Sequence, residues 1–148
     1  MSAATVCVFE QSPWWLPELQ RQLLSEDVHV RGVVSLADLE GGPKSVNPTL
    51  AVIALAGVEV RCLQFLGKLS LAGESLPVIV IGTTATAEWE WTLRELGAAQ
   101  FVRDTAGGEE VAELCRRLIQ NSQHTIQRGS GTDHFVKETD EAVSHQLQ

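Results

Sequence analysis

Three cysteines are the residues in this 148-residue chain that first suggest metal or redox chemistry. Cys7, Cys62 and Cys115 lie far apart, each inside a segment of apolar residues. Zinc sites and redox-active pairs require closely spaced cysteines, and the sequence has no such pair. We therefore predict three buried, reduced thiols that pack as small hydrophobic side chains, and no metal site.

Histidine and serine side chains are the next candidates, since they supply the base and the nucleophile of many hydrolases. The histidines are His29 in the apolar segment VHVRGVV and His124, His134 and His145 near the C-terminus. Neither Ser12 nor Ser35 lies in a Gly-x-Ser-x-Gly motif. A histidine on a flexible C-terminal segment is held too loosely for general-base catalysis. We therefore expect no enzymatic activity.

Phosphate-binding motifs are also missing from the sequence. It contains no Gly-x-Gly-x-x-Gly motif, no P-loop and no glycine-rich turn after its first apolar segment. The phosphates of nucleotides and flavins are usually held by such turns at the start of a helix. We therefore expect no bound cofactor.

Short apolar segments alternate along the chain with segments of helical spacing. The apolar segments are residues 6–9, 28–34, 50–55, 78–81 and 101–102. Single helix faces are formed by Leu16, Leu19, Leu23 and Leu24, by Cys62, Phe65, Leu66 and Leu69, by Trp89, Leu93 and Leu96, and by Val111, Leu114, Cys115 and Leu118. Segments 50–55 and 78–81 are apolar throughout, which indicates strands covered on both faces. The pattern predicts an α/β fold with three layers and a doubly wound parallel sheet.

The ends of the predicted elements carry signals that support this pattern. Ser35 precedes the segment LADLE, which is too short for more than a turn and a half of helix. Glu109 and Glu110 open the last helix, and Arg116 and Arg117 lie near its end, so that both pairs complement the helix dipole. The connection between the second and third strands is therefore expected to be the least regular element.

The composition predicts one globular domain over residues 1–120, because 44% hydrophobic content is enough for one sizeable core. From residue 121 to residue 148 the sequence is polar and contains a Gly-Ser-Gly linker. Residues 133–147 carry apolar side chains at the spacing of a weak amphipathic helix. We expect this tail either to form a short helix or to stay disordered until it binds a partner.

The charge of the chain bears on its partners and its location. The formal net charge is -8 and the pI is near 4.9, so nucleic acid and anionic membrane surfaces would repel it. No apolar stretch is long enough to span a membrane, and the start MSAATVCVFEQ lacks the features of a signal peptide. We expect a cytoplasmic protein that binds neither nucleic acid nor membranes.

Three segments resemble the receiver domain of two-component response regulators, the CheY-like family. They are VCVFEQSP at the first predicted strand, LPVIVIGTT at the fourth and LGAAQFVRD at the fifth. The Leu-Pro pair at 76–77 and the Gly-Ala-x-x-Phe-Val segment at 97–102 are the most specific features. The resemblance covers residues 5–119. It implies a flavodoxin-like sheet of five parallel strands in the order 2-1-3-4-5.

A receiver transfers a phosphoryl group to an aspartate at the end of its third strand, and two acidic residues after the first strand help to hold Mg²⁺. The resemblance places Ala54 at the aspartate position, and no Asp or Glu occurs between Gly41 and Val58. It places Glu10 and Gln11 at the acidic pair, which leaves one carboxylate for a metal that prefers several. We therefore expect no phosphorylation.

Receivers also bond the phosphoryl oxygens through a hydroxyl after the fourth strand and a lysine after the fifth. The resemblance places the hydroxyl position at Gly82, with Thr83 next to it, and the lysine position at Asp104. Arg103 is adjacent but would point to the opposite face. Glu10 and Asp104 would then border an empty phosphate position that either recruits a divalent cation or stays solvated. The resemblance thus implies a degenerate pseudo-receiver.

Four tryptophans without any tyrosine are unusual for a domain of this size. Trp14 and Trp15 follow the first predicted strand, and Trp89 and Trp91 follow the fourth. Both pairs would begin helices at the same edge of the sheet and so lie near each other. We expect Trp89 in the core, Trp91 exposed, and one of the first pair exposed. The alternatives are an aromatic interaction patch or four separate, half-buried rings.

Two functions remain open. The first is a protein-interaction module in two-component-type signalling, which binds another signalling protein or a second copy of itself. Its candidate surface residues are Trp14, Trp15, Trp91, Arg94, Glu95 and Arg103. The alternative is a flavodoxin-like sensor that binds a small ligand at the carboxyl ends of the strands, near the small and hydroxylated residues 82–86.

Overall fold

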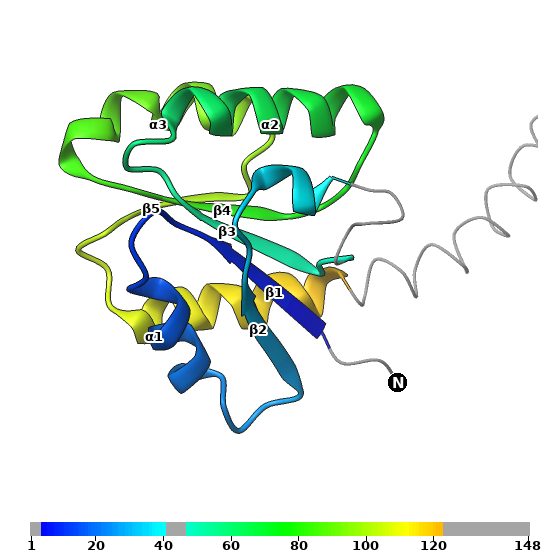
Figure 1. Cartoon of the computed structure of the whole chain (residues 1–148), viewed down its shortest axis with the longest axis vertical. Helices are drawn as coiled ribbons and strands as arrows, with labels where there is room; N and C mark the ends of the chain where they lie inside the picture. The colour runs from blue at the N-terminus through cyan, green and yellow to red at the C-terminus, as the bar shows by residue number, and fades with distance from the viewer. Residues whose placement is uncertain (1–3, 41–46, 123–148) are drawn as a thin grey trace, which may run out of the picture.

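The computed structural model describes residues 4–40 and 47–122, which form a sheet covered by helices (Figure 1). The strands are β1 (Ala4–Phe9), β2 (Val28–Gly32), β3 (Leu50–Ala54), β4 (Val78–Gly82) and β5 (Gln100–Arg103). Neighbouring strands pair in parallel, in the order β2-β1-β3-β4-β5. The predicted fold class, a doubly wound flavodoxin-like sheet of this order, is confirmed.

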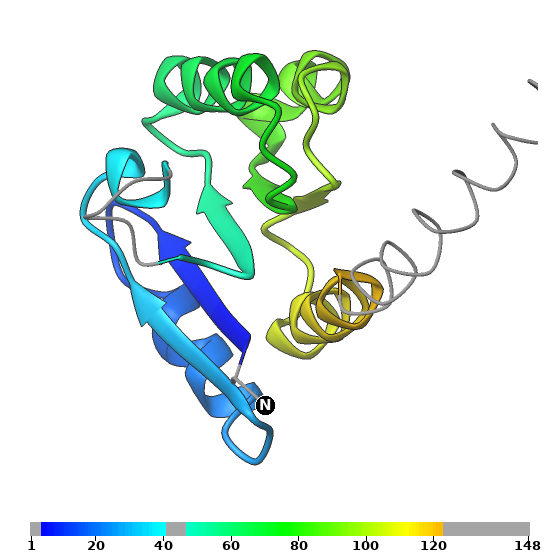
Figure 2. The ribbon, with the colours of Figure 1, turned by 90° about the vertical axis from the view of Figure 1, so that its right-hand side faces the viewer.

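Helices cover both faces of the sheet, which makes three layers. One face carries α1 (Trp15–Gln22) and a helix over residues 108–122. The other face carries α2 (Glu59–Ala72), α3 (Glu90–Glu95) and the 3-10 helices η1 (Leu36–Leu39) and η2 (Thr84–Trp89). Figure 2 shows α2 and α3 above the sheet and the helix 108–122 below it.

Each face of the sheet has its own apolar cluster. Along β1, Cys7 and Phe9 pack with the α2 layer, whereas Val6 and Val8 pack with α1 and the helix 108–122. All residues of β4 are buried, and so are the first four of β3. This burial on both faces explains why these two segments are apolar throughout rather than alternating.

The three cysteines are buried, as predicted, and none of them forms a disulfide bond. Cys7 and Cys62 lie in the cluster beneath α2, and Cys115 lies in the cluster beneath the helix 108–122. Burial raises the pKa of the Cys7 thiol, and it raises the pKa values of Cys62 and Cys115 to about 12. These thiols are therefore poor nucleophiles.

Two predicted boundaries are wrong, both around β2. The strand ends at Gly32 rather than at residue 34, and Val34 is exposed. α1 ends at Gln22, so Leu24 does not belong to its apolar face and is 82% exposed. Leu23 closes the helix, because its N–H bonds Leu19 O at 3.0 Å and its side chain is buried. The chain then turns, which leaves Leu24 in solvent.

The segment LADLE forms one 3-10 turn, η1, as its length suggested. Ser35 caps it, since its Oγ accepts a hydrogen bond from the Ala37 N–H at 3.1 Å. The predicted polar tail lies outside the described residues from 123 onward. Within the described part of the chain, none of the helices has the length and apolar character needed to cross a bilayer.

Candidate functional site

A cavity of about 370 Å³ lies at the carboxyl ends of the strands. It is lined by Glu10, Gln11, Ser12, Trp14, Trp15, Ala54, Ala56, Ile81, Thr83 and Asp104. The loops after β1, β3, β4 and β5 all contribute, as the sheet order requires. Most of these residues were predicted to lie at this edge. Ser12 was considered only as a hydrolase nucleophile, and Ala56 and Ile81 were not singled out, because their aliphatic side chains carry no chemical signal.

The floor of the cavity is apolar at the end of β3. Ala54 is the last residue of this strand, is half-buried, and packs against the cluster beneath α1. Its register partner on β4 is Ile81, which also lines the cavity. The strand therefore presents a methyl group to the cavity and no oxygen atom that a phosphoryl group could join.

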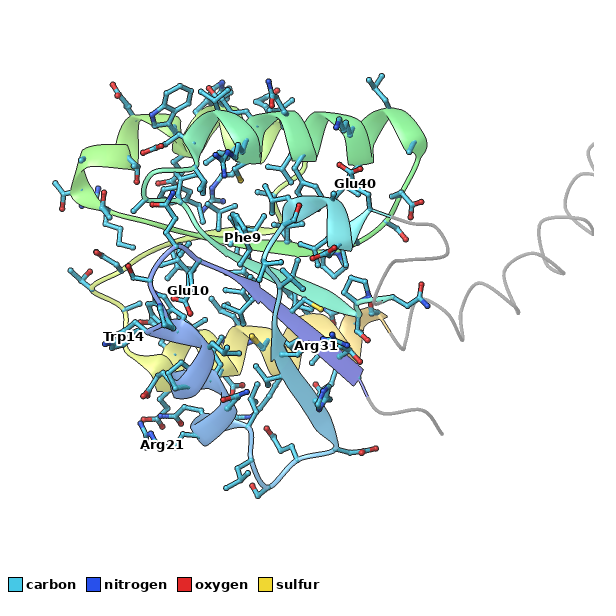
Figure 3. The ribbon with its side chains drawn as sticks, viewed as in Figure 1. Phe9, Glu10, Trp14, Arg21, Arg31 and Glu40 are labelled. Carbon is cyan, nitrogen blue, oxygen red and sulfur yellow. The ribbon has the colours of Figure 1, made fainter. Side chains whose placement is uncertain are left out.

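Glu10 lies at the cavity, but its carboxylate caps α1. The N–H groups of Trp14 and Trp15 donate to Glu10 Oε1 at 3.1 and 3.0 Å, and the Leu16 N–H donates to Oε2 at 2.8 Å. The N-cap residue itself, Trp14, makes no side-chain capping bond. Figure 3 labels Glu10 and Trp14 close together at the start of α1. Both carboxylate oxygens are thus occupied by the first turn of the helix.

Gln11 turns toward the loop after β3. A Cβ atom at Gly57 would lie 2.5 Å from Gln11 Oε1, and Gly57 has a φ of +80°. Position 57 therefore requires a glycine for two reasons: its backbone is left-handed, and the Gln11 amide lies where a side chain would begin. The cavity therefore carries a neutral amide beside the carboxylate of Glu10.

Gly82 and Thr83 differ in the space that the loop after β4 leaves for a side chain. A Cβ at Gly82 would overlap the ring of Phe101 and lie 2.8 Å from Thr86 Oγ1, so no hydroxyl-bearing side chain fits there. Thr83 lines the cavity instead. Its N–H donates to Thr86 Oγ1 at 2.7 Å, and its own Oγ1 lies 3.4 Å from the same atom. The buried Thr86 therefore fixes the orientation of this loop.

Asp104 is the second carboxylate at the cavity. The Asp104 N–H donates to Gly82 O at 2.7 Å, which holds the backbone of Asp104 against the end of β4. Asp104 as a whole is exposed to solvent. Arg103 does not line the cavity, in keeping with the alternation along β5. Within the described ranges 4–40 and 47–122, the lining contains two carboxylates and no Lys, Arg or His. Among the described residues, no group of three or more His, Cys, Asp or Glu is arranged to hold a metal ion.

The tryptophans divide between the two faces of the sheet. Trp15 is buried in the α1 layer and Trp14 is 56% exposed, with ring centroids 4.6 Å apart and planes at 74°. Trp89 is half-buried against the α2 cluster, and Trp91 is 73% exposed on α3. Neither of this second pair lines the cavity. The expected proximity of the two pairs is therefore wrong, because their helices leave the edge toward opposite layers.

The candidate surface residues Arg94, Glu95 and Arg103 are all exposed. Arg94 pairs with Glu90 within α3, with Nε to Oε2 at 3.2 Å. Glu95 ends this helix, and Arg103 ends β5. Arg94 and Glu95 follow Trp91 by three and four residues, so they place opposite charges beside its ring on one face of α3.

Solved structures of receiver domains share the fold of this chain. No family model and no curated protein matches its sequence. A response regulator receiver protein from Pseudoalteromonas atlantica is 16% identical, with a TM-score of 0.65 over 80% of this chain and 98% of that one. The receiver domain of the TMAO respiratory response regulator TorR is 16% identical, with a TM-score of 0.68 over the same shares. The fold is that of a receiver domain.

A third receiver, from a Francisella response regulator, is 12% identical and has a TM-score of 0.66 over 80% of this chain and 98% of that one. The high coverage of all three domains means that the receiver fold accounts for nearly the whole described structure. At these identities the likeness concerns the fold, and the chemistry of the cavity must be argued from its own residues.

Proposed function

We propose that this domain is a non-phosphorylatable pseudo-receiver that acts as a protein-interaction module in two-component-type signalling. The main support is the cavity at the position where receivers carry their phosphorylation site. It offers the methyl group of Ala54 instead of a nucleophile, and the carboxylate of Glu10 is committed to α1. Asp104 supplies a negative charge where a cation is needed to balance phosphate. We propose no enzymatic activity and a cytoplasmic location.

Incubation with acetyl phosphate and Mg²⁺ tests the loss of phosphoryl chemistry. Intact-protein mass spectrometry is expected to find no hydroxylamine-sensitive phosphate adduct on the wild-type chain. The double variant Ala54→Asp/Asp104→Lys returns a nucleophile and a cation, and adding Gln11→Asp returns the second acid, so this triple variant is the positive control. An adduct on the wild-type protein would end the proposal.

The proposed interaction surface is centred on Trp91. An exposed tryptophan is the residue type most enriched at binding hot spots, and Trp91 has 73% of its surface in solvent. Arg94 and Glu95 lie three and four residues after it on α3, and their charges supply orientation rather than most of the affinity. Arg103, exposed at the end of β5, is the remaining candidate. A receiver fold without phosphate to bind presents this surface in one constant conformation.

Affinity capture with the wild-type domain and with Trp91→Ala tests this surface. We expect the variant to recover the signalling partner at least about tenfold less efficiently, the loss of a hot-spot side chain. Sedimentation velocity of both proteins identifies the case in which the partner is a second copy. Undiminished capture and unchanged sedimentation of Trp91→Ala would exclude the surface. Leu24→Ala, at another exposed apolar residue on the opposite layer, is the matched control.

A second function is supported by the volume of the cavity. About 370 Å³ lies within the range of small-ligand sites, and Trp14 and Trp15 border it. The domain would then be a sensor that binds a small molecule at the carboxyl ends of the strands. A thermal shift screen tests this function, because a ligand at about 100 times its Kd adds about 2.7 kcal/mol to the free energy of unfolding.

A further inference from the structure

The electrostatics of the cavity favour a positively charged ligand. Among the residues that the structure describes, its lining contains Glu10 and Asp104 and no cationic side chain. Phosphate and other anions are repelled by this arrangement, so the cavity selects against the ligand of a working receiver. This inference rests on the proposed loss of phosphoryl binding at the same place.

A metal ion is a poorer match for the cavity than an organic cation. Divalent cations need several carboxylate oxygens at short distance. Both oxygens of Glu10 already accept backbone hydrogen bonds, at 2.8 to 3.1 Å. Gln11 contributes a neutral amide that leans toward Gly57. Of the two carboxylates in the lining, only that of Asp104 accepts no hydrogen bond from the first turn of α1. A single carboxylate matches a ligand with a single positive charge.

The remaining lining matches the apolar body of such a ligand. Trp14 and Trp15 form an edge-to-face pair at the cavity, with ring centroids 4.6 Å apart. Ala54, Ala56 and Ile81 supply aliphatic surface. Tryptophan is the side chain that attracts ammonium and guanidinium groups most strongly through its ring. An aromatic pair, an aliphatic floor and one free carboxylate are together suited to an alkylammonium group.

We propose that this cavity binds a monovalent alkylammonium group, with Asp104 pairing with its charge and Trp14 packing against its carbon atoms. The group belongs either to a free small amine or to a lysine side chain of a bound protein. Both sources present the same chemistry, an aliphatic stem that ends in an ammonium group. The Asp104 carboxylate and the Trp14 ring are exposed enough to be reached without unfolding.

Calorimetric titration of the full chain with n-butylammonium chloride tests the proposal, with sodium butyrate and inorganic phosphate as anionic comparisons. We expect saturable binding of the amine below about 10 mM, within the affinity open to so small a ligand, and none of either anion. Tryptophan emission should change over the same concentrations, because Trp14 and Trp15 border the cavity. A lysine-containing peptide with blocked termini distinguishes the two sources, since equal binding indicates that a partner's lysine is accepted.

Matched variants locate the binding. Asp104→Asn and Trp14→Ala are each expected to weaken amine binding by about two- to fivefold, and Asp104→Lys to abolish it. Asp27→Asn makes the same charge change in the turn at the other end of the sheet, so it should bind normally. Equal affinity of Asp104→Asn and wild type, phosphate binding, or no amine binding overturns the proposal. The acetyl phosphate experiment separately decides whether the pseudo-receiver proposal has failed.

Discussion

Glu10 connects the end of β1 to the first turn of α1 through three backbone hydrogen bonds. A carboxylate at this place satisfies N–H groups that a helix leaves without partners, and it complements the positive end of the helix dipole. Trp14, at the N-cap, has no oxygen with which to do the same. The start of α1 therefore depends on a residue that lies outside the helix.

Glu10→Gln should lower the free energy of unfolding by about 1–2 kcal/mol, because the charge-assisted bonds to the three N–H groups are weakened or lost. Urea denaturation monitored by far-ultraviolet circular dichroism measures the change. Glu95→Gln is the matched control, since Glu95 is exposed at the end of α3, and should stay within about 0.5 kcal/mol of wild type. Equal stability of Glu10→Gln and wild type would mean that the cap contributes nothing.

The positions around the cavity were largely predictable, whereas the role of Glu10 was not. The resemblance to receivers places Ala54, Thr83 and Asp104 at the ends of three strands, and parallel strands bring their carboxyl ends to one edge. The cap on α1 depends on the path of the loop between Glu10 and Trp14. Sequence rules for capping consider the residue immediately before a helix, and here that residue is a tryptophan.

At the scale of single elements, the contact between the end of β4 and β5 excludes a side chain at position 82. Gly82→Ala should destabilise the domain by about 1–3 kcal/mol, because the added methyl overlaps the Phe101 ring. Thermal or urea denaturation measures this loss. Gly82→Ala should cost less free energy of unfolding in a Phe101→Leu background, because the smaller side chain leaves room for the added methyl. This cost is the difference between the double variant Gly82→Ala/Phe101→Leu and Phe101→Leu alone. Additive effects of the two substitutions would show that Phe101 is not the obstacle.

The region from β2 to β3 is where element prediction failed, and burial explains why. β1, β3 and β4 are covered on both faces, so their apolar sequences mark them clearly. β2 lies at the sheet edge with Val30 buried and both His29 and Arg31 exposed. Helix α1 covers this strand on the side of Val30, so the opposite side faces solvent. The sequence of β2 therefore mixes polar and apolar residues, and its end was misplaced.

Considered as a whole molecule, the domain should lose stability at alkaline pH. The thiols of Cys62 and Cys115 ionise at the ordinary pKa of 9.0 when unfolded, whereas burial raises their pKa to about 12 in the fold. A raised pKa gives stability that is fully present below pH 9 and is lost as the pH rises toward 12. The chain has no tyrosine to titrate in this range.

Between pH 8 and pH 10 the free energy of unfolding should fall by about 1.4 kcal/mol for each of these two thiols. Urea denaturation at the two pH values under reducing conditions measures the difference. Cys62→Ala, which lacks one thiol, should be less stable than wild type at both pH values. Its free energy of unfolding should nevertheless fall by about 1.4 kcal/mol less than that of wild type between pH 8 and pH 10. A pH dependence identical to that of wild type would contradict the assignment.

The thin cover over β2 also determines where the domain opens first. A strand with one neighbouring strand, and with Val30 as its one buried residue, loses few apolar contacts when it detaches from β1 and α1. Opening of this kind requires much less free energy than unfolding of β3 and β4, whose faces are both buried. Amide protons of β2 should therefore exchange with deuterated water through small local fluctuations, whereas those of β3 should exchange only when the whole domain unfolds.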